Sequence, residues 1–137
     1  MQTLDMRFIR YLNLFDKITG VKSKNCFFYN NFLMFSIPDN LVSKAIGKKG
    51  GNVKKLSSII NKKIKIIALP NNMGETERFV SEIIAPVHFK NLEITHDEII
   101  ITASKQDKAA IIGRNKVRLS ELKKIIEENF GKKLRIV

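Results

Sequence analysis

The sequence predicts a mixed α/β protein of the α+β kind, in which each of two similar halves forms a three-stranded sheet packed by helices. The order helix, strand, strand, helix, turn, helix, strand occurs twice along the 137 residues. A glycine-containing turn interrupts a helical segment at Gly47 and again at Gly113, 66 residues later, which indicates an internal duplication. Hydrophobic residues make up 44% of the sequence, enough to fill small cores.

The first predicted element is a helix that ends at Gly20. Its apolar residues recur every three or four positions, the spacing that places side chains on one face of a helix. They are Leu4, Phe8, Tyr11, Phe15 and Ile18. Glycine adopts the left-handed conformation at no steric cost, so Gly20 marks the end of this helix.

Two apolar runs, 26–29 and 32–37, predict a β-hairpin. Only Asn30 and Asn31 separate them, and asparagine tolerates the left-handed backbone that a two-residue hairpin turn requires. Asp39 or Asn40 is then the expected cap of the next helix. The remaining elements of this half are a helix through Ala45, the turn 47–50, a helix with Val53, Leu56 and Ile60 on one face, a strand at 63–69 and a polar linker at 70–74.

The second half repeats this order after the linker. Its expected elements are a helix over 79–84 stopped by Pro86, strands at 87–94 and 99–102, a helix capped by Asp107 and running through Ile112, the turn 113–116, a helix over 119–126 followed by Gly131, and a strand at 133–137. The repeat predicts two domains, residues 1–70 and residues 71–137.

The charge is strongly positive and unevenly distributed. Lys and Arg number 25 against 13 Asp and Glu, and residues 1–70 hold 13 of the basic side chains but only three acids. No acid occurs between Asp39 and Glu75. That stretch contains Lys44, Lys48, Lys49, Lys54, Lys55, Lys62, Lys63 and Lys65. Such a field favours a polyanionic partner, and the alternative is a solvated lysine surface.

Several function classes are excluded or disfavoured by what the sequence lacks. One cysteine, Cys26, and two histidines, His88 and His96, are too few for a disulfide framework or a metal site. No Ser-His-Asp order and no GxxxxGK[ST] loop occurs, so we expect neither an enzyme nor a cofactor or small-molecule substrate. Without a signal peptide or an apolar run of about 20 residues, we expect a cytoplasmic protein with no membrane partner.

The turn 47–50 has the chemistry of a contact for a sugar-phosphate backbone. Its glycines let a ligand approach closely, and the helix that follows presents free N–H groups where an anion can bind. Lys48 and Lys49 add two cations. An apolar wall of Ile46, Val53 and Ile66 can hold unstacked bases beside it. The alternative is that the glycines only permit a bend between two helices.

These residues resemble a known family. The stretch 46–50, followed by Asn52 and Val53, resembles the signature GxxG loop of KH domains, which binds about four nucleotides. The order of elements is that of type II KH domains, and two of them in tandem resemble the KH pair of archaeal-type NusA transcription factors. The segment 84–87 is similar to that family as well. The likeness extends over essentially the whole chain.

The resemblance implies a non-enzymatic protein that binds single-stranded RNA, such as a nascent transcript, and acts in transcription elongation or termination. It also implies the transcription machinery as a partner. The RNA-binding residues expected on this basis are Lys44, Ile46, Gly47, Lys48, Lys49, Gly50, Asn52, Val53, Ile66, Gly113, Arg114, Asn115, Lys116 and Arg118.

The second turn departs from the family pattern. Lys116 stands where the pattern has glycine, and a lysine disfavours both close backbone approach and a left-handed φ. Its charge can replace a backbone contact by a side-chain contact to phosphate. We therefore expect the second turn to bind RNA more weakly than the first.

Other functions stay open on the sequence alone. The same fold serves in ribosomal proteins and ribosome-assembly factors, so ribosomal RNA is an alternative target. A protein-interaction scaffold is a third possibility, which Lys116 favours for the second half. Eight of the eleven aromatic residues lie within the first 35 positions, where they could stack on bases, although core packing is the favoured interpretation.

Overall fold

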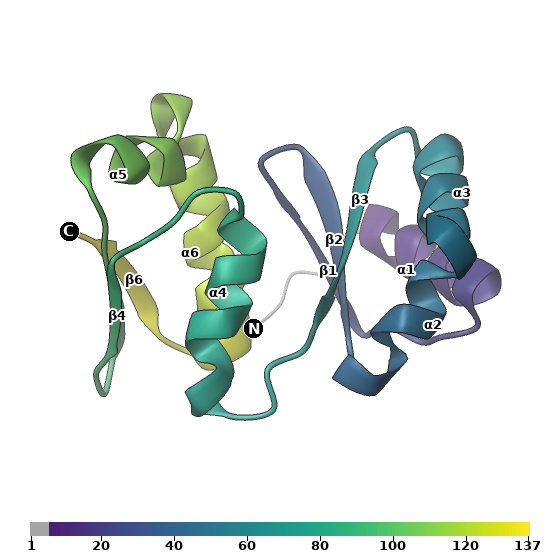
Figure 1. Ribbon diagram of the computed structural model, residues 1–137, viewed down its shortest axis with the longest axis horizontal. Coiled ribbons are helices and arrows are strands. Elements are labelled where there is room, and N and C mark those ends of the chain that lie inside the picture. Colours follow the sequence, from purple (N-terminus) through teal and green to yellow (C-terminus); the bar gives the residue numbers. More distant parts are fainter. Residues whose placement is uncertain (1–5) are drawn as a thin grey trace. The chain divides into compact units, whose positions relative to one another are not determined.

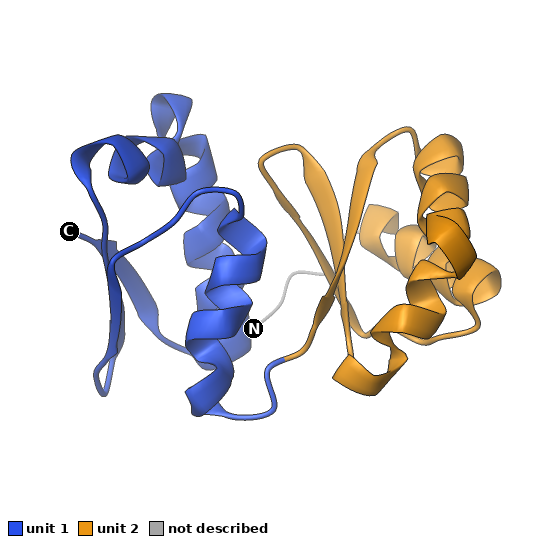
Figure 2. Ribbon diagram, viewed as in Figure 1, with its two compact units in different colours: residues 1, 70–137 blue, residues 2–69 orange. Residues whose placement is uncertain are grey.

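The structure is a computed structural model that describes residues 6–137, and in this range it has six α-helices and two three-stranded sheets (Figure 1). The chain divides into two compact units, one ending at Leu69 and the other beginning at Pro70 (Figure 2). We call them the N-terminal unit and the C-terminal unit and describe each by itself.

The N-terminal unit follows the predicted order of elements. These are α1 (Met6–Thr19), β1 (Asn25–Tyr29), β2 (Phe32–Ile37), α2 (Val42–Ile46), α3 (Gly51–Ile60) and β3 (Lys63–Ala68). The sheet order is β1-β2-β3, in which β2 pairs antiparallel with β1 and parallel with β3. The hairpin turn is confirmed, since Asn30 and Asn31 have φ of 52° and 66°. The stop after α1 is confirmed too, at Gly20 with φ 73°.

The core of this unit lies between the sheet and its three helices, which cover one face of the sheet (Figure 1). The rings of Phe15 from α1 and Phe35 from β2 stack with 4.4 Å between their centroids. Ala45 and Leu56 bring α2 and α3 onto the same cluster, and both are fully buried. These contacts join every helix to the sheet, so both helices that flank the turn between α2 and α3 are anchored in the core.

The C-terminal unit repeats the topology, with sheet order β4-β5-β6 and the same strand directions. Its elements are α4 (Thr76–Ile84), β4 (Asn91–Ile94), β5 (Glu98–Thr102), α5 (Lys105–Ile112), α6 (Val117–Phe130) and β6 (Lys133–Ile136). Phe79, Ile99, Ile101, Ile111 and Leu122 are fully buried. Helix α6 has 14 residues against ten in α3, so the last strand starts 70 residues after its counterpart rather than 66.

Three local expectations were wrong. The strand expected at 87–94 begins only at Asn91, because α4 is followed by a turn over residues 84–87, which the Val87 N–H closes by donating to the Ile84 carbonyl at 3.0 Å. The cap of α5 is Ser104, whose Oγ accepts the Asp107 N–H at 3.1 Å, and not Asp107.

Neither Asp39 nor Asn40 caps α2, because both lie inside a one-turn 3₁₀-helix (Asp39–Leu41) that precedes it. Of the predicted helical stripe, Leu4 lies outside the described residues.

Candidate nucleic-acid interface

The first glycine turn has a backbone that only glycine adopts readily. Gly47 ends α2 with φ 81° and ψ 169°, and Gly50 precedes α3 with φ 71° and ψ 21°. Between them, Lys49 also takes the left-handed conformation, with φ 55°. The Gly50 N–H donates to the Gly47 carbonyl at 3.1 Å, so the turn itself does not use the N–H groups of Lys48 and Lys49.

The second turn has the same geometry although its last glycine is absent. Gly113 has φ 73° and ψ 174°, Asn115 has φ 57°, and Lys116 has φ 60° and ψ 24°. The Lys116 N–H donates to the Gly113 carbonyl at 3.2 Å, as Gly50 does in the first turn. The expectation that lysine would avoid the left-handed region was therefore wrong. The conformation still costs about 1–2 kcal/mol for a residue with a Cβ, which neighbouring interactions must offset.

A side chain from the following helix crosses each turn. Asn52 Nδ2 lies 3.5 Å from the Lys44 carbonyl oxygen, and Arg118 Nη1 donates to the Ala110 carbonyl at 3.1 Å. Sequence reasoning placed both side chains against RNA, whereas the structure has each of them reaching back to the preceding helix. In both units these atoms bridge the two helices that flank the turn.

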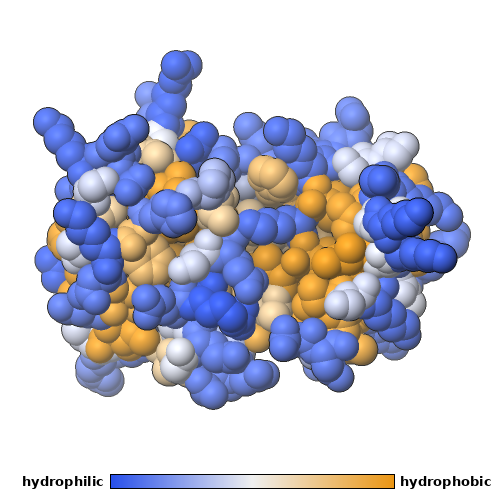
Figure 3. All heavy atoms as spheres, in the orientation of Figure 1, coloured by the Kyte–Doolittle hydropathy of each residue, from blue (hydrophilic) through white to orange (hydrophobic). Residues whose placement is uncertain are grey.

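Half-buried apolar residues lie beside the first turn, as expected. Ile46 ends α2, Val53 lies in the first turn of α3, and Ile66 pairs with Phe35 in the sheet. Helix α2 packs against both α3 and β3, which places these elements side by side. On the face shown in Figure 3, hydrophobic atoms are exposed over the strands and α2 of this unit, with hydrophilic side chains around them.

The C-terminal unit has an equivalent wall, which sequence reasoning missed. Ile112 and Leu119 are half-buried at the positions that correspond to Ile46 and Val53. Ile136 corresponds to Ile66, because it pairs with Ile101 as Ile66 pairs with Phe35. The repeat of 66 residues could have identified Ile112 and Leu119. It could not identify Ile136, because the longer helix α6 raises the offset to 70 residues.

The acid-free stretch is largely accessible to a polyanion. Seven of its eight lysines are exposed, and only Lys65 is half-buried. In the C-terminal unit, by contrast, acids neutralise some of the basic side chains. Arg78 Nη1 lies 3.0 Å from Glu82 Oε1, and Arg135 Nε lies 3.1 Å from Glu98 Oε2. The positive field is therefore stronger on the N-terminal unit.

Seven of the eight aromatic residues in the first 35 positions form two groups, and the eighth, Phe32, is half-buried with the Lys63 ammonium 5.6 Å from its ring centroid. Phe15, Phe27, Tyr29 and Phe35 are buried, which confirms core packing for them. Phe8, Tyr11 and Phe28 are half-buried and in mutual ring contact, with centroids 5.6–6.3 Å apart. The Lys62 ammonium lies over the Phe28 ring, 5.7 Å from its centroid. These rings therefore pack with neighbours of their own chain.

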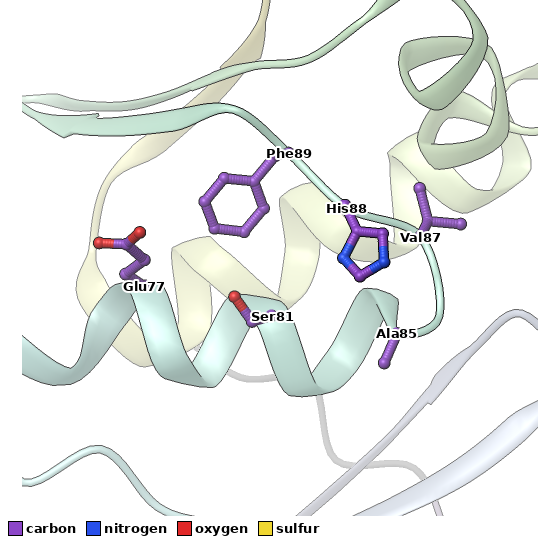
Figure 4. A pocket seen from close by; sticks show the side chains of 6 residues that line it. All are labelled: Glu77, Ser81, Ala85, Val87, His88 and Phe89. Atoms are coloured by element: carbon purple, nitrogen blue, oxygen red, sulfur yellow. The ribbon is translucent and has the colours of Figure 1, made fainter.

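One surface pocket of about 250 Å³ lies in the C-terminal unit, away from the predicted site residues (Figure 4). It lies between α4 and the loop that follows it, and its lining residues are Glu77, Ser81, Ala85, Val87, His88 and Phe89. His88 and His96 are exposed, and Cys26 is buried, with its Sγ 4.0 Å from the Phe8 carbonyl oxygen. Within residues 6–137, no helix is both long and apolar enough to cross a membrane.

Comparison with known proteins indicates a similarity over nearly the whole chain. It is 24% identical, over 131 residues, to a Halococcus morrhuae protein named "Probable transcription termination protein NusA", covering 93% of this chain and 92% of the other. Among solved structures, the crystal structure of APE1850 matches with a TM-score of 0.67 and 26% identity, over 98% of this chain and all of that one. No family model matches. The chain is thus similar over nearly its whole length to a protein named NusA, and it has a mixed α+β fold.

Proposed function

We propose that this protein is a non-enzymatic RNA-binding protein with two tandem type II KH domains, residues 1–70 and 71–137, that acts on single-stranded RNA in transcription. The observation that carries the proposal is the repeated turn geometry. Both turns leave two backbone N–H groups unused just before a helix and have basic side chains around them. Such a turn suits a sugar-phosphate backbone rather than a reacting group.

In the N-terminal unit, the RNA backbone would follow the turn 47–50. The N–H groups of Lys48 and Lys49 would donate to a phosphate oxygen, and their exposed ammonium groups would neutralise neighbouring phosphates. The bases would then lie against Ile46, Val53 and Ile66, whose half-buried apolar surface suits unstacked rings. Lys44 is exposed one helical turn before Gly47, and it would add a cation beside the path of the RNA backbone.

The second turn would bind RNA in the same way but with less charge around it. Gly113 and the N–H groups of Arg114 and Asn115 correspond to the first turn, and Ile112, Leu119 and Ile136 form the apolar wall. Lys116 would contact phosphate through its ammonium group. Two such sites on one chain would bind one RNA more tightly than either alone.

The similarity to the Halococcus morrhuae protein supports a role in transcription termination. Ultraviolet crosslinking of the full chain in extract of its source cells, followed by sequencing of the attached RNA, tests this proposal. Enrichment of nascent transcripts is the expected result. Enrichment of precursor or mature ribosomal RNA would move the function to ribosome assembly, and recovery of no RNA above a mock sample would refute RNA binding.

A further inference from the structure

We propose that Arg118 is a positioning residue that holds the second turn in its glycine-turn geometry although Lys116 has replaced the glycine. Arg118 Nη1 donates to the Ala110 carbonyl at 3.1 Å, across the turn. That carbonyl belongs to the last turn of α5, where helix carbonyls have no partner within the helix. The bond therefore ties the end of α5 to the start of α6, on either side of residues 113–116.

The side chain also covers the first glycine of the turn. A Cβ placed on Gly113 would lie 2.8 Å from Arg118 Cγ and 3.0 Å from its Cδ, closer than carbon atoms approach. The methylene groups of Arg118 thus lie directly on the Gly113 backbone. Gly113 and Arg118 therefore act together: the missing Cβ of the glycine leaves space for the arginine side chain, and the arginine links the two helices.

The first turn offers a natural comparison. Asn52 occupies the same place, over Gly47, but its Nδ2 lies 3.5 Å from the Lys44 carbonyl oxygen, at the limit of a hydrogen bond. Gly50 adopts φ 71° without strain, so this turn has one non-glycine residue in the left-handed region, Lys49, whereas the second turn has two, Asn115 and Lys116. Where Lys116 must adopt φ 60°, the neutral amide is replaced by a guanidinium, whose charge-assisted bond is shorter and stronger. The stronger hydrogen bond of Arg118 therefore compensates for the backbone strain that Lys116 adds to the second turn.

Amide hydrogen exchange of the full chain tests this compensation without any RNA. Arg118→Ala should speed exchange of the hydrogen-bonded amides of residues 116 and 117, which donate to the Gly113 and Arg114 carbonyls, by about threefold or more. In the Lys116→Gly background the same change should have less than about half of that effect, because the relaxed turn no longer needs the bond. Asn52→Ala, the matched control, should alter exchange of the hydrogen-bonded amides of residues 50 and 51 by less than twofold on the same reasoning. Equal effects of Arg118→Ala in the two backgrounds would overturn the proposal.

A second test rests on the proposed function and measures binding of a fluorescein-labelled single-stranded RNA of mixed sequence. Arg118→Ala should weaken binding about threefold or more in the unmodified chain, and clearly less when it is compared with the Lys116→Gly variant alone, which already lacks the Lys116 ammonium. If Arg118 instead contacted RNA directly, Arg118→Ala would weaken binding equally in the two backgrounds, and the positioning role would be refuted. Failure of the unmodified chain to bind this RNA would refute the proposed function but leave the exchange result standing.

Discussion

Replacing Lys48 and Lys49 by aspartate tests whether the first turn contacts the sugar-phosphate backbone. Both side chains are exposed and form no hydrogen bond or ion pair with the described part of the chain, so the fold should tolerate the change. Lys49 has φ 55°, a conformation that aspartate adopts more readily than lysine does. Two lost phosphate contacts at about 1 kcal/mol each correspond to roughly 30-fold, and repulsion adds to this.

The matched variant is Arg114→Asp with Asn115→Asp in the second turn. It occupies the same two positions of the same backbone geometry but removes only one cation. The C-terminal unit also has less positive charge to lose, because acids such as Glu82 and Glu98 already pair with its arginines. We therefore expect this variant to weaken binding clearly less than Lys48→Asp with Lys49→Asp.

Fluorescence anisotropy with a labelled single-stranded RNA measures both variants, after thermal melts have shown that each is folded. A loss of tenfold or more for the first pair and a smaller loss for the second is the expected result. Equal losses would show that the two turns contribute equally to one RNA path, and that Lys116 does not weaken the second. No loss for the first pair would remove the turn from the RNA interface.

Three further predictions follow from the same geometry. The protein should bind an RNA oligonucleotide better alone than annealed to its complement in a filter-binding assay, because the apolar walls need unstacked bases; equal affinity for duplex would contradict this. The log–log plot of affinity against salt should have a slope of about −2 to −5, at roughly 0.7 for each phosphate contact, and a flat response would mean that the lysines do not face nucleic acid. In urea unfolding, Gly47→Ala should lower the free energy of unfolding by about 2–3 kcal/mol, because the new Cβ adds a clash with Asn52 to backbone strain. Gly50→Ala should lower it by only about 1 kcal/mol, because its new Cβ meets nothing within 4 Å. The reverse order would refute this account of the turn.

Much of the fold could be predicted because local rules and tertiary packing agree. The pair Asn30-Asn31 and the glycines at 20 and 131 act through backbone conformations that few other residues adopt, so their positions alone identify turns and helix ends. The start of β4 could not be predicted, because apolar residues at 87 and 89 look like strand residues in sequence. Instead, Val87 closes a turn after α4 through its N–H, which donates to the Ile84 carbonyl, and the strand begins only at Asn91.

The candidate site was predicted in part. The glycines and loop lysines were identifiable because their chemistry depends on residue type and spacing alone. The bridging contacts of Asn52 and Arg118 were not, because they depend on where two helix ends lie in space. Lys116 was misjudged for a similar reason, since propensity disfavours its φ while the surrounding turn imposes it.

The four additional residues of α6 show which changes in length a repeated fold can absorb. At 3.6 residues per turn, an insertion of four rotates the end of a helix by about 40° beyond a full turn, so the chain still leaves on the side of the sheet. An insertion of two would rotate it by about 200° and direct the last strand into solvent. Divergence between the two copies should therefore proceed by whole helical turns within helices and by single residues only in loops. An alignment of the halves at one constant offset will misalign everything after the longer helix.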